Sequence, residues 1–114
     1  DNIAKNPPSS EIVILHGNVL CYDSYSGRYF ESSMDAIQKA ENTVNFKIIN
    51  EMYASLSDFY EELGVEPTEH SELVGWNQEE LLGVTFSSTL TPDGKPCLAV
   101  DFRSLPFDQF SKLA

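Results

Sequence analysis

The spacing of apolar residues changes twice along this 114-residue chain. Apolar residues form short runs in residues 12–31, recur every three to four positions in residues 33–63, and alternate with polar residues in residues 84–102. Runs and alternation are typical of β-strands, and a three-to-four-residue repeat is typical of an amphipathic helix. The order predicts an α+β fold: an antiparallel sheet built from an N-terminal and a C-terminal hairpin, with two helices packed on one face.

The start of the chain differs in composition from the rest. Residues 1–10 include Asn, Ser and two adjacent Pro residues, a combination that disfavours helices and strand pairing. We therefore predict a flexible linker over residues 1–10 and one domain over residues 11–114. A chain of this length can bury enough surface for one hydrophobic core.

Two turn signals organise the N-terminal strands. Gly17-Asn18 separates two apolar runs, Ile12–Leu15 and Val19–Tyr22, which predicts a hairpin because Gly supplies the positive φ of a tight turn. The polar loop Asp23–Gly27 then predicts a second tight turn, followed by a third strand over Arg28–Glu31.

The helical repeat begins at Ser33 and predicts a long amphipathic helix. Its apolar face consists of Met34, Ile37, Ala40, Val44, Ile48 and Met52. Ser32 and Asp35 have the spacing of a capping box at its start. A shorter helix is predicted to begin near Ser55 and to end at Gly64 in a left-handed cap.

The C-terminal half contains one unassigned segment and one predicted hairpin. Residues 66–80 show no clear period and hold Trp76, for which a place in the core and a role as an exposed binding anchor are both considered, the core being favoured. Residues 84–90 and 98–103 alternate around Pro92-Asp93-Gly94, which predicts an antiparallel hairpin with a tight turn.

Charge excludes some function classes. The chain has 18 Asp and Glu against 7 Lys and Arg, a net charge of -11, which repels nucleic acid phosphates and anionic lipids. We expect no direct nucleic acid binding. The longest apolar run is too short to cross a membrane, so any membrane attachment is expected to come from sequence upstream of Asp1.

The acidic residues are concentrated in one stretch. Residues 48–94 contain no Lys or Arg, and their acidic residues are Glu51, Asp58, Glu61, Glu62, Glu66, Glu69, Glu72, Glu79, Glu80 and Asp93. Carboxylates in the last turn of a helix oppose its dipole, and like charges at i,i+4 repel, so helix stability does not explain this choice. The stretch serves either solubility or an acidic face for a basic protein partner, with Glu61, Glu62, Glu66 and Glu69 as candidate contacts.

No pattern of catalytic or metal-binding residues stands out. His16 has no Ser, Cys or carboxylate partner at a defining spacing, and Glu69, His70 and Glu72 lack a further fixed ligand. Cys21 and Cys97 are expected to be buried free thiols. We expect no cofactor, no metal and no enzymatic activity.

The loop Asp23–Gly27 is the remaining candidate. It carries Tyr25 and leads into Arg28, so it is either a recognition surface with an aromatic tip or an ordinary turn in which Asp and Ser bind backbone amides. We retain Tyr25 and Arg28, together with Trp76, as candidate partner-binding residues.

Several short motifs carry a resemblance to a known group of proteins. They are Tyr22–Phe30, Glu31-Ser32, Ala40-Glu41, Asn45, Tyr53–Leu56, Asp58–Tyr60, Leu63-Gly64 and Gly75-Trp76. Over residues 19–102 this pattern resembles a family of uncharacterised phage and prophage proteins of Gram-positive bacteria. The resemblance implies no catalytic residue, and it implies hydrophobic, membrane-directed segments upstream of this domain.

These observations lead to a ranked set of functions. The first is a noncatalytic protein-protein interaction domain encoded by a phage or prophage, in an infected or lysogenic cell. The alternative is an acidic inhibitor that mimics nucleic acid and binds a host defence protein. A small enzyme ranks last.

Overall fold

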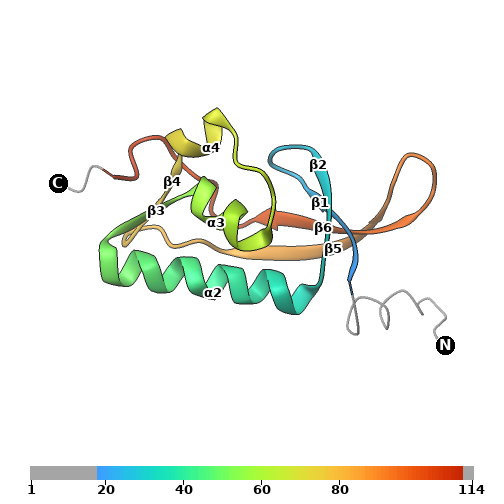
Figure 1. Cartoon of the computed structure of the whole chain (residues 1–114), viewed down its shortest axis with the longest axis horizontal. Helices are drawn as coiled ribbons and strands as arrows, with labels where there is room; N and C mark the ends of the chain where they lie inside the picture. Colours follow the sequence, from blue (N-terminus) through green and yellow to red (C-terminus); the bar gives the residue numbers. More distant parts are fainter. Residues whose placement is uncertain (1–17, 112–114) are drawn as a thin grey trace. The chain divides into compact units, whose positions relative to one another are not determined.

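The computed structural model describes residues 18–111 (Figure 1). The elements in chain order are β1 (Val19–Asp23), β2 (Arg28–Ser32), α2 (Met34–Glu51), β3 (Tyr53–Ser55), α3 (Leu56–Leu63), α4 (Glu69–Leu73), β4 (Gly75–Asn77), β5 (Val84–Leu90) and β6 (Pro96–Phe102). The predicted α+β class is therefore confirmed. The described chain forms two compact units, one with residues 18–37 and Thr85–Asp101, the other with Gln38–Val84 and residues 102–111.

Strands β1, β2, β5 and β6 form a sheet with the order β2-β1-β6-β5. β1 and β2 are antiparallel, with registered pairs from Val19↔Ser32 to Asp23↔Arg28. β6 runs parallel to β1, with Cys21 opposite Leu98. The prediction of a fully antiparallel sheet is therefore wrong, because alternation identifies strands but not their neighbours. The predicted strand Ile12–Leu15 lies outside the described residues.

The interior position of β6 explains its burial. Residues 97–100 are all buried, as expected of a strand with neighbours on both sides and side chains covered on both faces. The turn between β5 and β6 is the predicted one: Thr91 N donates to Lys95 O at 2.9 Å, and Gly94 has a φ of 88°.

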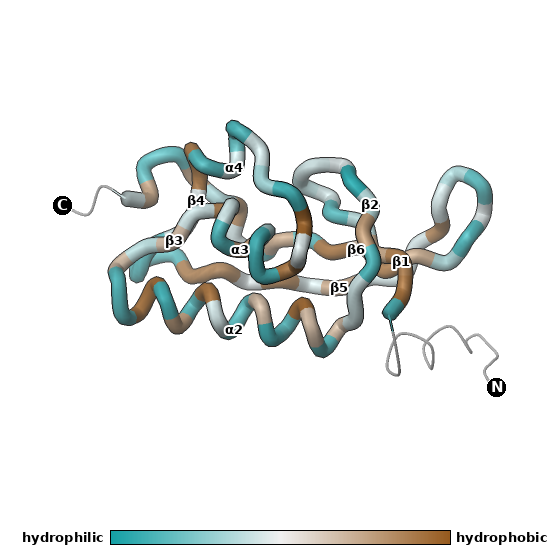
Figure 2. Tube along the Cα trace, in the orientation of Figure 1, coloured by the Kyte–Doolittle hydropathy of each residue, from teal (hydrophilic) through white to brown (hydrophobic). Residues whose placement is uncertain are grey.

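Helix α2 has most of the predicted apolar face: Ile37, Ala40, Val44 and Ile48 are buried, and Figure 2 shows hydrophobic residues recurring along the helix. The prediction is wrong for Met52, which follows the helix end at Glu51 and is 50% exposed. The predicted N-cap is wrong by one residue: Ser33 Oγ accepts from Ala36 N at 3.1 Å. Ser32 is buried as the last residue of β2 and pairs with Val19, so it belongs to the sheet.

Helix α3 begins and ends as predicted. Ser55 is its N-cap, and Gly64 adopts the left-handed conformation with a φ of 78°. Val65 N donates to Tyr60 O at 2.9 Å, which completes the hydrogen bonding expected of a left-handed helix end.

Residues 66–80, which show no period in the sequence, contain two further elements. One is helix α4, capped by Thr68, whose side chain accepts from Ser71 N. The described residues therefore hold three helices, and the prediction of two is wrong because α4 is too short to give a helical repeat. β4 pairs with β3 as a two-stranded antiparallel sheet in which Ala54 lies opposite Trp76. Elements of three to five residues are too short for periodicity to reveal.

Candidate functional site

Trp76 lies inside the second unit and has 0% exposure. Its indole nitrogen donates to Ser104 O at 2.8 Å, and its ring makes edge contacts with Phe59 and Phe102 at centroid distances of 6.4 and 5.6 Å. The core interpretation of Trp76 is thus confirmed, and this side chain offers no surface to a partner.

The turn after β1 is held by its own side chains. The buried Asp23 carboxylate accepts from Tyr25 N at 3.2 Å and from Ser26 Oγ at 2.7 Å. Gly27, with a φ of 75°, donates to Asp23 O, and Arg28 Nε donates to Ser26 Oγ. Burial first, and the nearby Asp23 charge second, raise the pKa of Tyr25. These contacts are those expected of an ordinary turn in which Asp and Ser bind neighbouring groups, which is the second of the two interpretations of the loop Asp23–Gly27.

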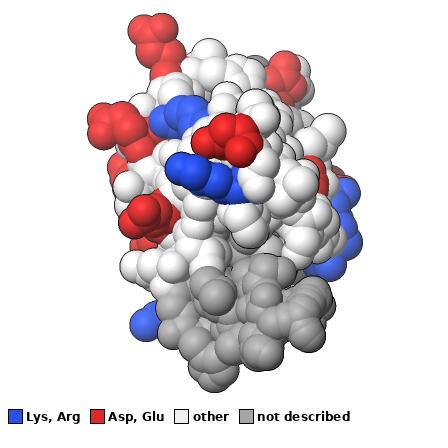
Figure 3. Space-filling model, turned by 90° about the vertical axis from the view of Figure 1, so that its right-hand side faces the viewer, with Lys and Arg blue, Asp and Glu red and all other residues white. Residues whose placement is uncertain are grey.

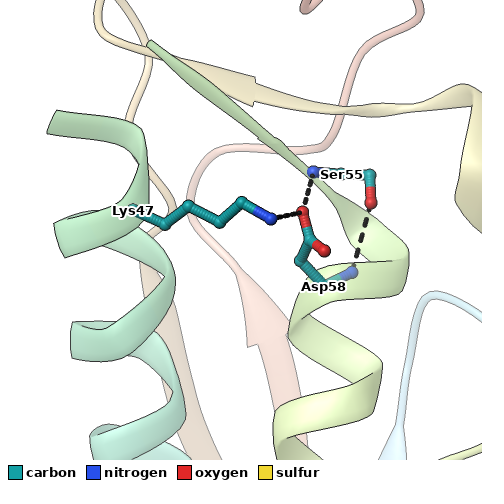
Figure 4. Close-up of polar contacts among 3 residues, drawn as sticks. All are labelled: Lys47, Ser55 and Asp58. Carbon is teal, nitrogen blue, oxygen red and sulfur yellow. Dashed lines mark hydrogen bonds and ion pairs between the residues drawn. The ribbon is translucent and has the colours of Figure 1, made fainter. Parts of the chain in front are cut away.

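Asp58 has a structural role that the sequence did not reveal. Its side chain accepts from Ser55 N at 3.0 Å, while Ser55 Oγ accepts from Asp58 N at 3.2 Å, so the two residues form a capping box (Figure 4). The same carboxylate lies 3.1 Å from Lys47 Nζ on α2. The sequence predicts no role in helix stability for the acidic residues of the stretch 48–94. For Asp58 that prediction is wrong.

The four glutamates predicted as partner contacts are exposed. Glu61 and Glu62 lie at the end of α3, Glu66 follows its cap, and Glu69 begins α4, so all four belong to the second unit. Figure 3 shows a face of the molecule on which basic and acidic side chains are interspersed. Acidic side chains therefore do not cover the whole surface.

A surface that the sequence analysis missed lies at the end of α2. Phe46 and Ile49 are 70% and 61% exposed, and Met52 and Tyr53 are 50% and 42% exposed. Residues three and four apart on a helix are neighbours, so Phe46 and Ile49 adjoin, and Met52 and Tyr53 follow directly after the helix end. We name Phe46, Ile49, Met52 and Tyr53 the apolar strip.

Met52 holds an unusual backbone conformation within this strip. Its φ is 85°, and it is the single non-glycine residue with positive φ in the described part of the chain. Met52 N still donates to Ile48 O at 2.8 Å, so Met52 occupies the left-handed position that ends α2. A residue with a Cβ costs about 1 to 2 kcal/mol there, whereas Gly does not.

Polar contacts fix the surroundings of the apolar strip. Gln78 Nε2 donates to Ile49 O at 3.1 Å and binds carbonyls that the end of α2 leaves open. Asn45 exchanges two hydrogen bonds with the backbone of Leu82, at 2.9 and 3.0 Å. These contacts tie residues 78–82 to the helix, so the strip rests on a fixed support.

Lys47, which follows Phe46 in the chain, interacts with three carboxylates. The hydrogen bond with Asp58, and then the charges of Asp58, Glu51 and Glu61, raise the pKa of Lys47 against the opposing effect of burial. Lys47 is thus already paired with Asp58, and the charges of Glu51 and Glu61 also act on it.

The remaining candidates from the sequence are the two cysteines and the possible metal ligands. Cys21 and Cys97 are buried free thiols, as predicted. Within residues 18–111 we find no group of three or more His, Cys, Asp or Glu side chains suited to a metal ion; His16 lies outside that range. No helix of the described chain is long and apolar enough to span a bilayer.

Comparison with known proteins identifies a family. A family model described as a family of unknown function, DUF6353, matches residues 1–111. No curated protein and no solved structure matches the chain.

Proposed function

The chain belongs to the DUF6353 family of unknown function, and from its surface we propose that it is a noncatalytic protein-protein interaction domain. The binding surface is the apolar strip, and the partner is an amphipathic helix with a basic polar face. Aromatic residues and Met are enriched at the buried core of protein interfaces. Anchors at i and i+3 suit the packing of one helix against another.

The observation that carries this proposal is the conformation of Met52. Glycine would end α2 without strain, yet the chain uses a bulky apolar residue that remains 50% exposed. Strain retained without a gain in folding stability is characteristic of functional positions. Met52 is only half-buried, so burial offsets little of this strain, and we assign the exposed part of its side chain to partner binding.

The charge near the strip supports a basic partner. Glu51 and Glu61 act on Lys47 beside the strip, and the chain carries a net charge of -11. A basic partner is attracted at long range, whereas an acidic one is repelled. The partner therefore combines an apolar stripe with Lys or Arg residues. Glu61, Glu62, Glu66 and Glu69 serve as its charged rim.

The test uses two synthetic helical peptides with the same Leu-rich face, one with Lys and Arg on its polar face and the other with Glu. We expect the basic peptide to bind and the acidic one not to bind. The double variant Phe46→Ser and Ile49→Ser should weaken binding by at least about tenfold, the equivalent of about 1.4 kcal/mol. Absence of binding by the basic peptide would overturn the proposal.

A matched control comes from the same unit. Leu73 and Leu105 are 65% and 64% exposed, similar to Phe46 and Ile49, but they lie outside the apolar strip. The double variant Leu73→Ser and Leu105→Ser should bind the basic peptide as wild type does. Equal losses in both double variants would indicate nonspecific apolar association instead.

Replacing Glu61, Glu62, Glu66 and Glu69 by Gln tests the contribution of charge to peptide binding separately from that of apolar contact. Rim charges mainly set the association rate and its salt dependence. The quadruple variant should therefore bind more slowly at low salt, with a smaller salt effect, while the dissociation rate changes little. An unchanged rate and salt effect would remove these glutamates from the interface.

The phage or prophage origin implied by the resemblance is part of the proposal. The alternative, an acidic inhibitor that mimics nucleic acid, differs in what it requires. It depends on carboxylates alone, so the quadruple Gln variant would abolish its binding while the Phe46 and Ile49 variant would not. The same measurements therefore decide between the two functions.

A further inference from the structure

The first unit contains a groove that is separate from the apolar strip. It has a volume of about 480 Å³ and is lined by Tyr22, Ser24, Tyr29, Ser87, Ser88, Thr89, Leu90, Pro92, Cys97 and Ala99. Ligand sites in proteins commonly occupy roughly 300 to 1,000 Å³. The groove is large enough for a small ligand or for part of a chain-like one.

Strand register places the floor and one wall of the groove. Tyr22 lies opposite Tyr29 on β2 and opposite Ala99 on β6, so these three side chains lie on the same face of the sheet. Cys97, two residues before Ala99, shares that face. Two small side chains thus form the floor, and the two tyrosine rings form one wall at a centroid distance of 4.9 Å.

The other wall is polar but uncharged. Ser87, Ser88 and Thr89 of the edge strand β5 are exposed and line the groove with Leu90. The lining includes no Asp, Glu, Lys, Arg or His, and burial raises the pKa of the Cys97 thiol. In a chain of net charge -11, a ten-residue surface without a charge is a distinct environment.

We propose that this groove binds a neutral oligosaccharide. The half-exposed ring of Tyr29 stacks on the apolar face of a sugar, and hydroxyls of β5 hydrogen-bond to sugar hydroxyls, with Ser87 and Thr89 on one face of the strand and Ser88 on the other. A charged ligand would lose its hydration without meeting an opposite charge. A fully apolar ligand would leave the hydroxyls of the second wall without partners.

The probes are maltotriose, cellotriose and tri-N-acetylchitotriose, with a trimer of galacturonic acid as the charged control. The readout is the change in backbone amide resonances of the full chain during titration. At least one neutral trimer should shift resonances of β5 and of the Tyr22 to Tyr29 hairpin, with a dissociation constant of about 1 mM. The charged trimer should not bind.

Variants test the two walls separately. Tyr29→Ala should weaken binding by about tenfold, since a ring contact is worth up to about 1.5 kcal/mol. Tyr53→Ala removes a tyrosine of similar exposure, 42% against 47%, outside the groove, and should leave sugar binding unchanged. Because Tyr29 is half-exposed, its loss should not unfold the chain.

Three outcomes would overturn the proposal. They are the absence of shifts with every neutral trimer, equal binding of the charged trimer, and equal losses in the two tyrosine variants. If a proline-rich peptide shifts the groove resonances and the sugars do not, the ligand is a peptide. Peptide binding to the apolar strip is tested with Phe46 and Ile49 variants, and sugar binding to the groove is tested with a Tyr29 variant. The proposed function and the sugar-binding proposal can therefore fail independently.

Discussion

Lys47 on α2 and Asp58 on α3 form an ion pair with 3.1 Å between Nζ and Oδ2. The same Asp58 carboxylate accepts from Ser55 N, so one side chain both caps α3 and links it to α2. Both side chains are partly exposed, at 40% and 27%, so the ion pair alone contributes little and the cap contributes more.

Asp58→Ala should therefore lower the free energy of unfolding by about 1 to 2 kcal/mol, through the lost cap and pair. Glu62→Ala, on the same helix at an exposed position, should change it by less than about 0.5 kcal/mol. Urea unfolding of both variants measures the difference. Equal effects would mean that the capping box contributes nothing.

Gly27 should be sensitive to substitution because of its backbone conformation alone. Its φ is 75°, yet an added Cβ would lie 3.6 Å from Tyr22 Oη, an ordinary contact. Gly27→Val should cost about 1 kcal/mol or more, whereas Gly27→Asn should cost less because Asn tolerates the left-handed region. Thermal unfolding of both variants tests this; identical midpoints would contradict a role for φ.

Gly75 should be sensitive for a different reason. A Cβ there would lie 2.1 Å from Ala54 O and 2.7 Å from Ser55 Cα, both backbone atoms of β3. Gly75→Ala should destabilise the chain by about 3 kcal/mol or more. Gly83→Ala is the control, since its Cβ would meet only the Arg103 side chain, at 3.0 to 3.3 Å, and that side chain can move. Equal costs would place the β3-β4 pairing in error.

Phe59 should be among the most important core residues. It has 1% exposure, and its ring contacts those of Trp76 and Phe102 at 6.4 and 5.8 Å. Phe59→Ala should cost about 3 to 5 kcal/mol, while Glu61→Ala, two residues later and exposed, should be neutral or slightly stabilising. Chemical denaturation distinguishes them, and similar costs would contradict the assigned helix face.

Cys21 should make stability fall at alkaline pH. Burial is the main cause that raises its pKa from 9.0 to about 11. Below pH 9 the Cys21 thiol is protonated in both the folded and the unfolded state, so the stability that the buried thiol contributes is fully present. Above pH 9 the unfolded thiol ionises first, and about 2 to 3 kcal/mol is lost by the time the pH passes 11.

The measurement is the free energy of unfolding between pH 8 and pH 11, for wild type and for Cys21→Ala. The variant should start less stable, because a buried side chain is lost, but should show a smaller decrease with pH. Parallel pH profiles for the two proteins would show that Cys21 does not cause the decrease.

The candidate site divides into a part that the sequence reveals and a part that it does not. The exposed carboxylates Glu61 and Glu62 are evident from the chain, because a run without Lys or Arg needs no structure to be noticed. The apolar strip is not evident. Phe46 and Ile49 are as apolar as the buried Val44 and Ile48, and a helical repeat does not say which side chains a neighbouring element covers.

Local signals determined the longer elements of this protein and their ends, but not the short elements α4 and β4. The buried face of α2, the cap at Ser55 and the left-handed glycines 27, 64 and 94 follow from side-chain period and backbone sterics, which act over a few residues. Tertiary structure alone decided the parallel pairing of β6 with β1, the β3-β4 pair and the ring contacts of Trp76 with Phe59 and Phe102. These depend on contacts between residues far apart in the chain, whose free energy no local pattern records.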